Sequence, residues 1–308
     1  MYLKSTRYPV RFISFVTIII GMLSSPCAMA AGSVSEKLVV YSVNYPLAYF
    51  ARRIGGEHVD VHLPVPAGED PAFWMPDSDT ITAYQQADLV LLNGAGYAKW
   101  VDRVSLPGRR RVNTSASFRD AYIPVEQSVT HQHGPGGDHS HTGTAFTTWL
   151  DFSLAAQHAQ SINAAMSRAR PAMADVFEAN YQKLARDLEK LDREMQRVAG
   201  QYADRPMLAS HPVYQYLARR YKLNIESVTW EPDVMPDRDE WRMLSRKLQA
   251  FPADVMLWER QPLPETRERL QQMGLQVVVF DPVMNAPSEG GFLMQMQANV
   301  NELLHPGE

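Results

Sequence analysis

The chain has 308 residues, with 30 lysines and arginines against 34 aspartates and glutamates and a formal net charge of −4. Hydrophobic residues make up 45% and charged residues 21%, which is ordinary for a globular protein and predicts a substantial core. The length is enough for two lobes of usual domain size. The acidic balance argues against a nucleic-acid partner.

Residues 1–30 have the pattern of a secretory signal. Three basic residues precede an apolar run over residues 12–23, and a small-residue cleavage sequence ends at Ala30. Since the run is too short for a membrane span, we expect cleavage after about Ala30. Residues 24–26 (SSP) before Cys27 make a poor lipoprotein signal, so we expect a periplasmic protein without a lipid anchor. Cleavage leaves 27 basic and 34 acidic residues, a net charge of −7, and removes Cys27, the single cysteine. The mature fold must therefore be held by burial without disulfides.

Residues 31–150 are expected to form an N-terminal α/β lobe. Strands are predicted over 37–43, 58–65, 88–92 and 110–113, and helices over 46–54, 77–87 and 97–104. Asp77 or Ser78 is the expected N-cap of the second helix. Strands that alternate with helices in this way indicate a parallel, doubly wound sheet.

A histidine-rich loop, residues 131–141, lies near the end of this lobe. It holds His131, His133, His139 and His141, four of the nine histidines of the chain, among glycines that prevent regular structure. Such tracts commonly bind metal ions. A solvated linker is the alternative, whereas an interrupted pattern inside the chain argues against a purification tag.

Residues 151–200 are predicted to be helical. One helix is expected over 153–169 and a second over 172–200, and Pro171 separates the two. The second has apolar residues at three-to-four-residue spacing and would be about 40 Å long. We interpret it as a rigid helix that links the N-terminal lobe to a C-terminal α/β lobe over residues 201–308.

Polar side chains follow three strand-like runs of the C-terminal lobe. The runs cover 207–209, 254–258 and 276–280, and they end in His211, Glu259 and Asp281. In open parallel sheets, ligands bind beyond the carboxyl ends of the strands. Imidazole and carboxylate groups together bind zinc and other divalent metals, so these three residues are candidate metal ligands. The alternative is that each simply caps the helix that follows its strand.

The whole mature chain resembles the zinc/manganese-type solute-binding proteins of bacterial ABC importers, the family of metal-binding lipoproteins and adhesins. The matching stretches are 68–71 with 76–79, 87–90, 149–151, 210–211 with 216–221, and 281–282. The resemblance implies two lobes joined by one long helix, with a cleft between them that holds one Zn²⁺ or another divalent metal such as Mn²⁺. It also implies a monomer that catalyses nothing and delivers the metal to an inner-membrane permease, with a periplasmic metallochaperone as a further partner.

The same resemblance shows two departures from the family's ligand set. Ala72 and Thr147 stand where the family has histidines, whereas His211 and Asp281 match the other two ligands. Glu259 is the first candidate to complete the coordination. Further candidates are Glu69, Asp70, Asp77 and His141.

These observations leave three main hypotheses for function, and a purely structural or adhesive role stays open beside them. The first is a periplasmic binding protein that carries zinc to an ABC importer, because imidazoles of the loop suit zinc better than manganese. The second is a diverged relative whose cleft has lost metal binding, which acts as a metal chaperone through the histidine-rich loop or binds a different ligand. The third is a metal-assisted hydrolase using the same strand-end residues, but the chain has no HExxH, no GxSxG and no P-loop. We therefore expect no enzyme.

Overall fold

The computed structural model describes residues 37–125 and 143–306 with their side chains, residues 130–132 and 138–140 by their backbone, and seven of the first nine residues. Residues 36–308 form one unit, distinct from residues 1–35. The apolar run of the expected signal lies outside the described residues. Within the described part, no helix combines the length and the apolar character needed to cross a membrane.

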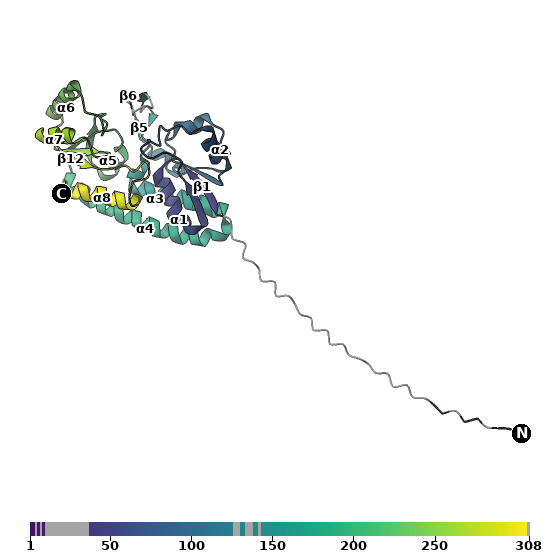
Figure 1. Ribbon diagram of the computed structural model, residues 1–308. Coiled ribbons are helices and arrows are strands. Elements are labelled where there is room, and N and C mark those ends of the chain that lie inside the picture. The colour runs from purple at the N-terminus through teal and green to yellow at the C-terminus, as the bar shows by residue number, and fades with distance from the viewer. Residues whose placement is uncertain are drawn as a thin grey trace. The chain divides into compact units, whose positions relative to one another are not determined.

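Two four-stranded parallel sheets form the two lobes (Figure 1). The N-lobe sheet has the order β2 (Val59–His62), β1 (Leu38–Ser42), β3 (Leu89–Leu92) and β4 (Arg111–Asn113). The C-lobe sheet has the order β10 (Asn224–Ser227), β9 (Pro206–Ala209), β11 (Val255–Trp258) and β12 (Gln276–Val279). In each sheet the strand that comes first in the sequence lies between the next two strands: β1 lies between β2 and β3, and β9 between β10 and β11. The prediction of two doubly wound parallel lobes is confirmed.

Eight α-helices surround these sheets in the described part of the chain. They are α1 (Tyr45–Gly55), α2 (Ser78–Gln86), α3 (Phe152–Ala169), α4 (Ala174–Ala199), α5 (Gln215–Tyr221), α6 (Arg238–Ala250), α7 (Pro264–Gln272) and α8 (Phe292–Leu304). Asp77 caps α2 as expected, accepting a hydrogen bond from the Thr80 N–H at 2.8 Å. Two short antiparallel pairs lie at the histidine-rich loop: β5 (Pro124–Val125) with β8 (Gly143–Thr144) brackets it, and β6 (Thr130–Gln132) with β7 (Asp138–Ser140) lies almost wholly within it. The expectation that glycines prevent regular structure in this loop is wrong for these last two strands.

Helix α4 links the lobes, as its spacing predicts. Its apolar side chains, from Phe177 to Val198, are buried, and it packs against α1, α3 and α8 along the lower edge of the view in Figure 1. At its far end, Asp192 accepts two hydrogen bonds from the Arg220 guanidinium, at 3.0 and 2.6 Å, and one from the Tyr221 hydroxyl. One continuous apolar core therefore runs through both lobes.

Besides the two short antiparallel pairs, the structure differs from the sequence-based expectation at four places. Strand β10 and helix α6 were not foreseen, because β10 (NIES) alternates exposed with half-buried residues at a sheet edge and α6 buries only Trp241 and Leu244. The helix expected over 97–104 is a short 3-10 helix, Lys99–Arg103. Helix α5 begins at Gln215 rather than directly at Pro212, because a turn closed by the Val213 N–H on the His211 carbonyl comes first.

His158 on α3 is a buried, neutral histidine held between two threonines. The Thr114 hydroxyl donates to the Leu92 carbonyl at 2.9 Å, so at its 2.7 Å contact with His158 Nδ1 it must accept the ring N–H. The bare Nε2 then accepts the Thr148 hydroxyl at 2.8 Å. Burial lowers the pKa of His158 to about 3. The neutral ring is fully satisfied, and protonation would place an unpaired charge in the core.

Acid should therefore destabilise the fold through His158. The folded protein binds the proton less tightly than the unfolded chain, so stability is lost as the pH falls from 6.5 toward 3. Between pH 7 and pH 5 the loss assigned to this residue is about 2 kcal/mol. Urea unfolding of wild type and His158→Gln at both pH values measures it, because all other titrating groups are shared. Equal pH dependence in the two proteins would contradict this assignment.

Candidate metal centre

The carboxyl ends of β9, β11 and β12 bring the three expected residues to one edge of the C-lobe sheet. Because these strands are adjacent, His211, Glu259 and Asp281 follow neighbouring strands. Glu259 and Asp281 line a cleft of about 320 Å³, and His211 lies directly behind Glu259. The N-lobe contributes residues 68–71 to the same cleft. The residues thus lie at the sheet edge that the strand pattern predicts, beside a cleft of the kind that the family resemblance implies.

His211 is paired with Glu259 at the base of this cleft. The ring is 2% exposed, and its Nδ1 lies 3.0 Å from Glu259 Oε1 and 3.9 Å from Glu231 Oε1. Burial by itself lowers the pKa of His211. The hydrogen bond and charge of Glu259, with the charges of Glu231 and Asp70, outweigh burial and raise that pKa above its ordinary value. The ring therefore lies in a strongly negative field that attracts a cation.

Glu231 is a cleft residue that the sequence reading missed. It follows β10, the strand that was not foreseen, and its side chain is only 16% exposed. The sequence contains a local pattern that could have indicated Glu231. Three acidic residues that precede a proline, Asp70, Glu231 and Asp281, all line the cleft. A residue before proline is restricted to extended backbone, so each acid–proline pair fixes the chain direction at a carboxylate. Asp77, another early candidate, is at the cap of α2 and does not line the cleft.

Asp281 begins a segment, residues 281–285, that ties the C-lobe to the N-lobe. The backbone of Asp281 is held by Asn299 on α8, which donates to its carbonyl at 2.6 Å and accepts its N–H at 3.2 Å. The Pro282 carbonyl accepts the Trp149 indole N–H at 2.7 Å, and the Met284 carbonyl accepts the Tyr45 N–H at 3.0 Å. We call residues 281–285 the strap.

The strap has a strained residue at its centre. Val283 is buried and has φ +57°, a left-handed conformation that β-branched residues rarely adopt. Its N–H donates to Asp281 Oδ1 at 2.7 Å. Burial raises the pKa of Asp281, and the nearby Glu259 charge adds to this effect against the opposing Val283 N–H. The surrounding structure thus stabilises a backbone form that costs about 1–3 kcal/mol, and this form orients one oxygen of Asp281.

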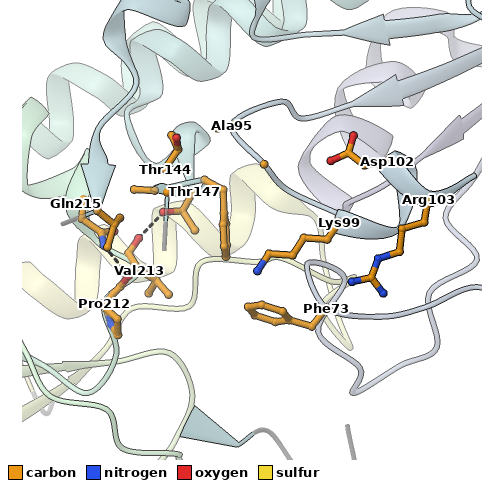
Figure 2. Close-up of a pocket in the computed structure, with 15 residues that line it drawn as sticks. Phe73, Ala95, Lys99, Asp102, Arg103, Thr144, Thr147, Pro212, Val213 and Gln215 are labelled. Atoms are coloured by element: carbon orange, nitrogen blue, oxygen red, sulfur yellow. Dashed lines mark hydrogen bonds between the residues drawn. The ribbon is translucent and has the colours of Figure 1, made fainter. Parts of the chain in front are cut away.

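Ala72 and Thr147 offer no ligand to the cleft. Ala72 is buried, and its N–H donates to Asp70 Oδ1 at 2.8 Å. The Thr147 hydroxyl donates to the Val213 carbonyl at 2.5 Å, as Figure 2 shows. Thr147 lines a separate hollow of about 420 Å³, in which Lys99 lies over the ring of Phe73. That hollow shares no lining residue with the cleft.

The loop histidines are only partly described. His131 and His139 are direct backbone partners in the β6–β7 pair, whereas His133 and His141 lie outside the described residues. Among the side chains that are described, no three histidine, cysteine, aspartate or glutamate residues already converge as a metal site. In the described structure the strand-end residues are close together, but a metal ion would still have to draw them to ligand distance.

The strap also makes a side-chain tie to the N-lobe loop of the cleft. Asn285 Nδ2 donates to the Pro66 carbonyl at 2.7 Å and to the Glu69 carbonyl at 3.1 Å. Asn285→Ala should lower the free energy of unfolding by about 1–2 kcal/mol, because both bonds are lost together with the one that Asn285 Oδ1 accepts from the Ala286 N–H at 2.7 Å. Urea unfolding checks this, with Asn301→Ala on the exposed side of α8 as the matched control. A loss no larger than that of the control would show that the tie contributes nothing.

Known proteins are similar to this chain over most of its length. The family model described as "Zinc-uptake complex component A periplasmic" (ZnuA) matches residues 39–305. The zinc-binding lipoprotein AdcA of Streptococcus pneumoniae is 22% identical over 301 residues, which cover 92% of this chain and 59% of AdcA. The manganese ABC transporter substrate-binding lipoprotein PsaA of the same species is 25% identical over 215 residues, covering 67% of this chain and 66% of PsaA.

A solved structure agrees with the fold. The Zn(II)-bound ZnuA-like domain of Streptococcus pneumoniae AdcA superposes with a TM-score of 0.73 at 18% identity, covering 87% of this chain and 98% of that domain. At this identity the likeness shows the fold alone. The chain spans less than two thirds of the length of AdcA and PsaA. Because the family match covers most of the sequence, the chain belongs to the ZnuA family of periplasmic zinc-uptake components.

Proposed function

We propose that this protein is a periplasmic solute-binding protein that captures a divalent metal, zinc first, and delivers it to the permease of an ABC importer. The observation that carries the proposal is the cleft itself: one buried imidazole lies among carboxylates at the carboxyl ends of parallel strands. Family membership and the printed names of AdcA and PsaA support transport of a metal rather than catalysis. The expected signal at residues 1–30 fits export to the periplasm.

The proposed ligands are His211, Glu259 and Asp281. His211 would supply the single nitrogen donor, and the two carboxylates would supply oxygens. Glu231 and Asp70 line the same cleft and their charges raise the pKa of His211, so they are the candidates to complete a four-coordinate zinc sphere. Binding would replace the proton on His211 and break its hydrogen bond to Glu259, which frees both side chains for the metal.

The donor set also bears on the choice of metal. Carboxylate oxygens suit manganese and other hard cations, whereas imidazole suits zinc. A cleft with one imidazole and several carboxylates is therefore expected to discriminate between Zn²⁺ and Mn²⁺ less sharply than a site with several imidazoles. Zinc remains the first candidate because the family is one of zinc uptake.

A second candidate function rests on the positions of Ala72 and Thr147. Both residues are buried. The Ala72 N–H donates to the Asp70 carboxylate and the Thr147 hydroxyl to the Val213 carbonyl, and no three potential ligands among the described side chains are preassembled. The cleft would then have lost metal binding, and the protein would act as a metal chaperone through His131, His133, His139 and His141. An organic ligand is less well supported, because the tryptophans near the strand ends, Trp149, Trp230 and Trp258, are buried in the cores.

His211→Ala should abolish tight zinc binding in the cleft, because His211 contacts the cleft residue Glu259 at 3.0 Å and no histidine among the described side chains lines the cleft itself. Calorimetric titration of metal-stripped protein measures the loss, which we expect to exceed about 100-fold in affinity. His58→Ala is the matched control, since His58 follows α1 and lines neither the cleft nor the hollow at Thr147. Wild-type affinity in His211→Ala would refute the assignment of this residue.

Deleting residues 131–141 separates the two candidate functions. The importer proposal expects fewer zinc ions bound per protein and one tight site that survives, because the cleft ligands lie elsewhere in the chain. The same calorimetric titration gives the number of zinc ions bound per protein and the affinity of each site. An unchanged circular dichroism spectrum checks that the deletion variant is folded. If all tight binding disappears with the loop, the chaperone function replaces the importer function.

A further inference from the structure

A second hollow lies on the N-lobe, at the edge of the sheet opposite the metal cleft. Its volume is about 440 Å³, and Arg109, Arg111, Arg168 and Asp88 line it together with residues of β3, β4 and α3. All strands of the N-lobe sheet are parallel, so their amino ends share one edge and their carboxyl ends the other. Asp88 and Arg109 come before β3 and β4, whereas the cleft loop 68–71 follows β2. The two cavities are therefore separate.

Local structure explains why the arginines of this hollow are available. The chain has three consecutive arginines, 109–111, of which only the middle one is engaged. The Arg110 guanidinium donates to the carbonyls of Gln85, Gln86 and Ala87, at the C-terminal end of α2, at 2.9–3.0 Å. Arg110 is thus fixed against the end of a helix. Its two neighbours are exposed and both line the hollow.

The positive charge of the hollow is not neutralised by the protein. Among the described side chains, Arg109, Arg111 and Arg168 form no ion pair and no side-chain hydrogen bond. The carboxylate of Asp88 is already engaged, since one of its oxygens accepts the Val39 N–H at 2.9 Å and the Arg170 guanidinium at 3.3 Å. Three like charges around one cavity repel each other.

We propose that this hollow binds an anion that carries more than one phosphate group or a cluster of phosphate headgroups. The planar guanidinium fork matches phosphate oxygens bidentately, and hydrogen bonds between charged partners are the strong ones. A volume of about 440 Å³ exceeds that of a single phosphate and suits several oxyanion groups at once. Two sources offer this chemistry, a soluble polyphosphate and the headgroups of anionic phospholipids. In the second case the carrier would be held at the membrane that contains its permease.

The test compares wild type with the triple variant R109Q/R111Q/R168Q. The control is R186Q/R197Q/R246Q, which removes the same charge from exposed arginines of α4 and α6 that form no ion pair in the described structure. Tripolyphosphate binding is measured by calorimetry, and lipid binding by flotation with phosphatidylglycerol-containing and pure phosphatidylcholine vesicles. We expect the triple variant to lose about tenfold or more in affinity and the control to lose little.

The outcomes decide both the site and the source. If R109Q/R111Q/R168Q loses tripolyphosphate binding and the control keeps it, the result supports a soluble ligand. If the same variant loses binding to phosphatidylglycerol vesicles and the control keeps it, the result supports a headgroup. Equal losses of affinity in the variant and the control would show that only the net charge matters, and would overturn the proposal. Failure of the wild-type protein to bind either probe would overturn it as well. Zinc affinity should be unchanged in both variants, because none of these residues lines the cleft.

Discussion

The buried pair of His211 and Glu259 is the interaction on which the cleft depends. It places one imidazole, 2% exposed, within 3.0 Å of a carboxylate and in the field of two more acidic side chains. Without a metal ion, the positive charges that face these carboxylates are the Arg260 guanidinium, which lines the cleft, and a proton on His211, whose pKa is raised. A divalent cation would supply two positive charges at the same place and leave the carboxylates as ligands. The proposed function follows from this charge balance more than from the number of histidines.

The position of Asp281 depends in turn on contacts from the other lobe. The strap that begins at Asp281 receives hydrogen bonds from Trp149 and Tyr45 and donates to the loop that carries Glu69 and Asp70. Val283 keeps its strained conformation because these contacts surround it. Because the lobes also share α4 and one continuous core, the cleft is built across a body with many fixed ties.

The strand ends and the linking helix were predictable because simple periodicities determine them. Parallel strands bring their carboxyl ends together, so His211, Glu259 and Asp281 had to meet at one edge, and apolar spacing along α4 fixed its buried face. Glu231 was missed because β10 alternates polar residues at a sheet edge and gives no apolar run. The three arginines of the second hollow were equally invisible, since only the three-dimensional contacts show that Arg110 is engaged while its neighbours are not.

The most direct test of the account is the X-ray absorption spectrum of zinc bound at one equivalent to the protein that lacks residues 131–141. The account predicts a coordination sphere with a single imidazole and otherwise oxygen ligands, and loss of the imidazole signal in His211→Ala. Two or more imidazoles around the metal, or an unchanged spectrum in that variant, would show that the cleft described by His211, Glu259 and Asp281 is not where the metal binds.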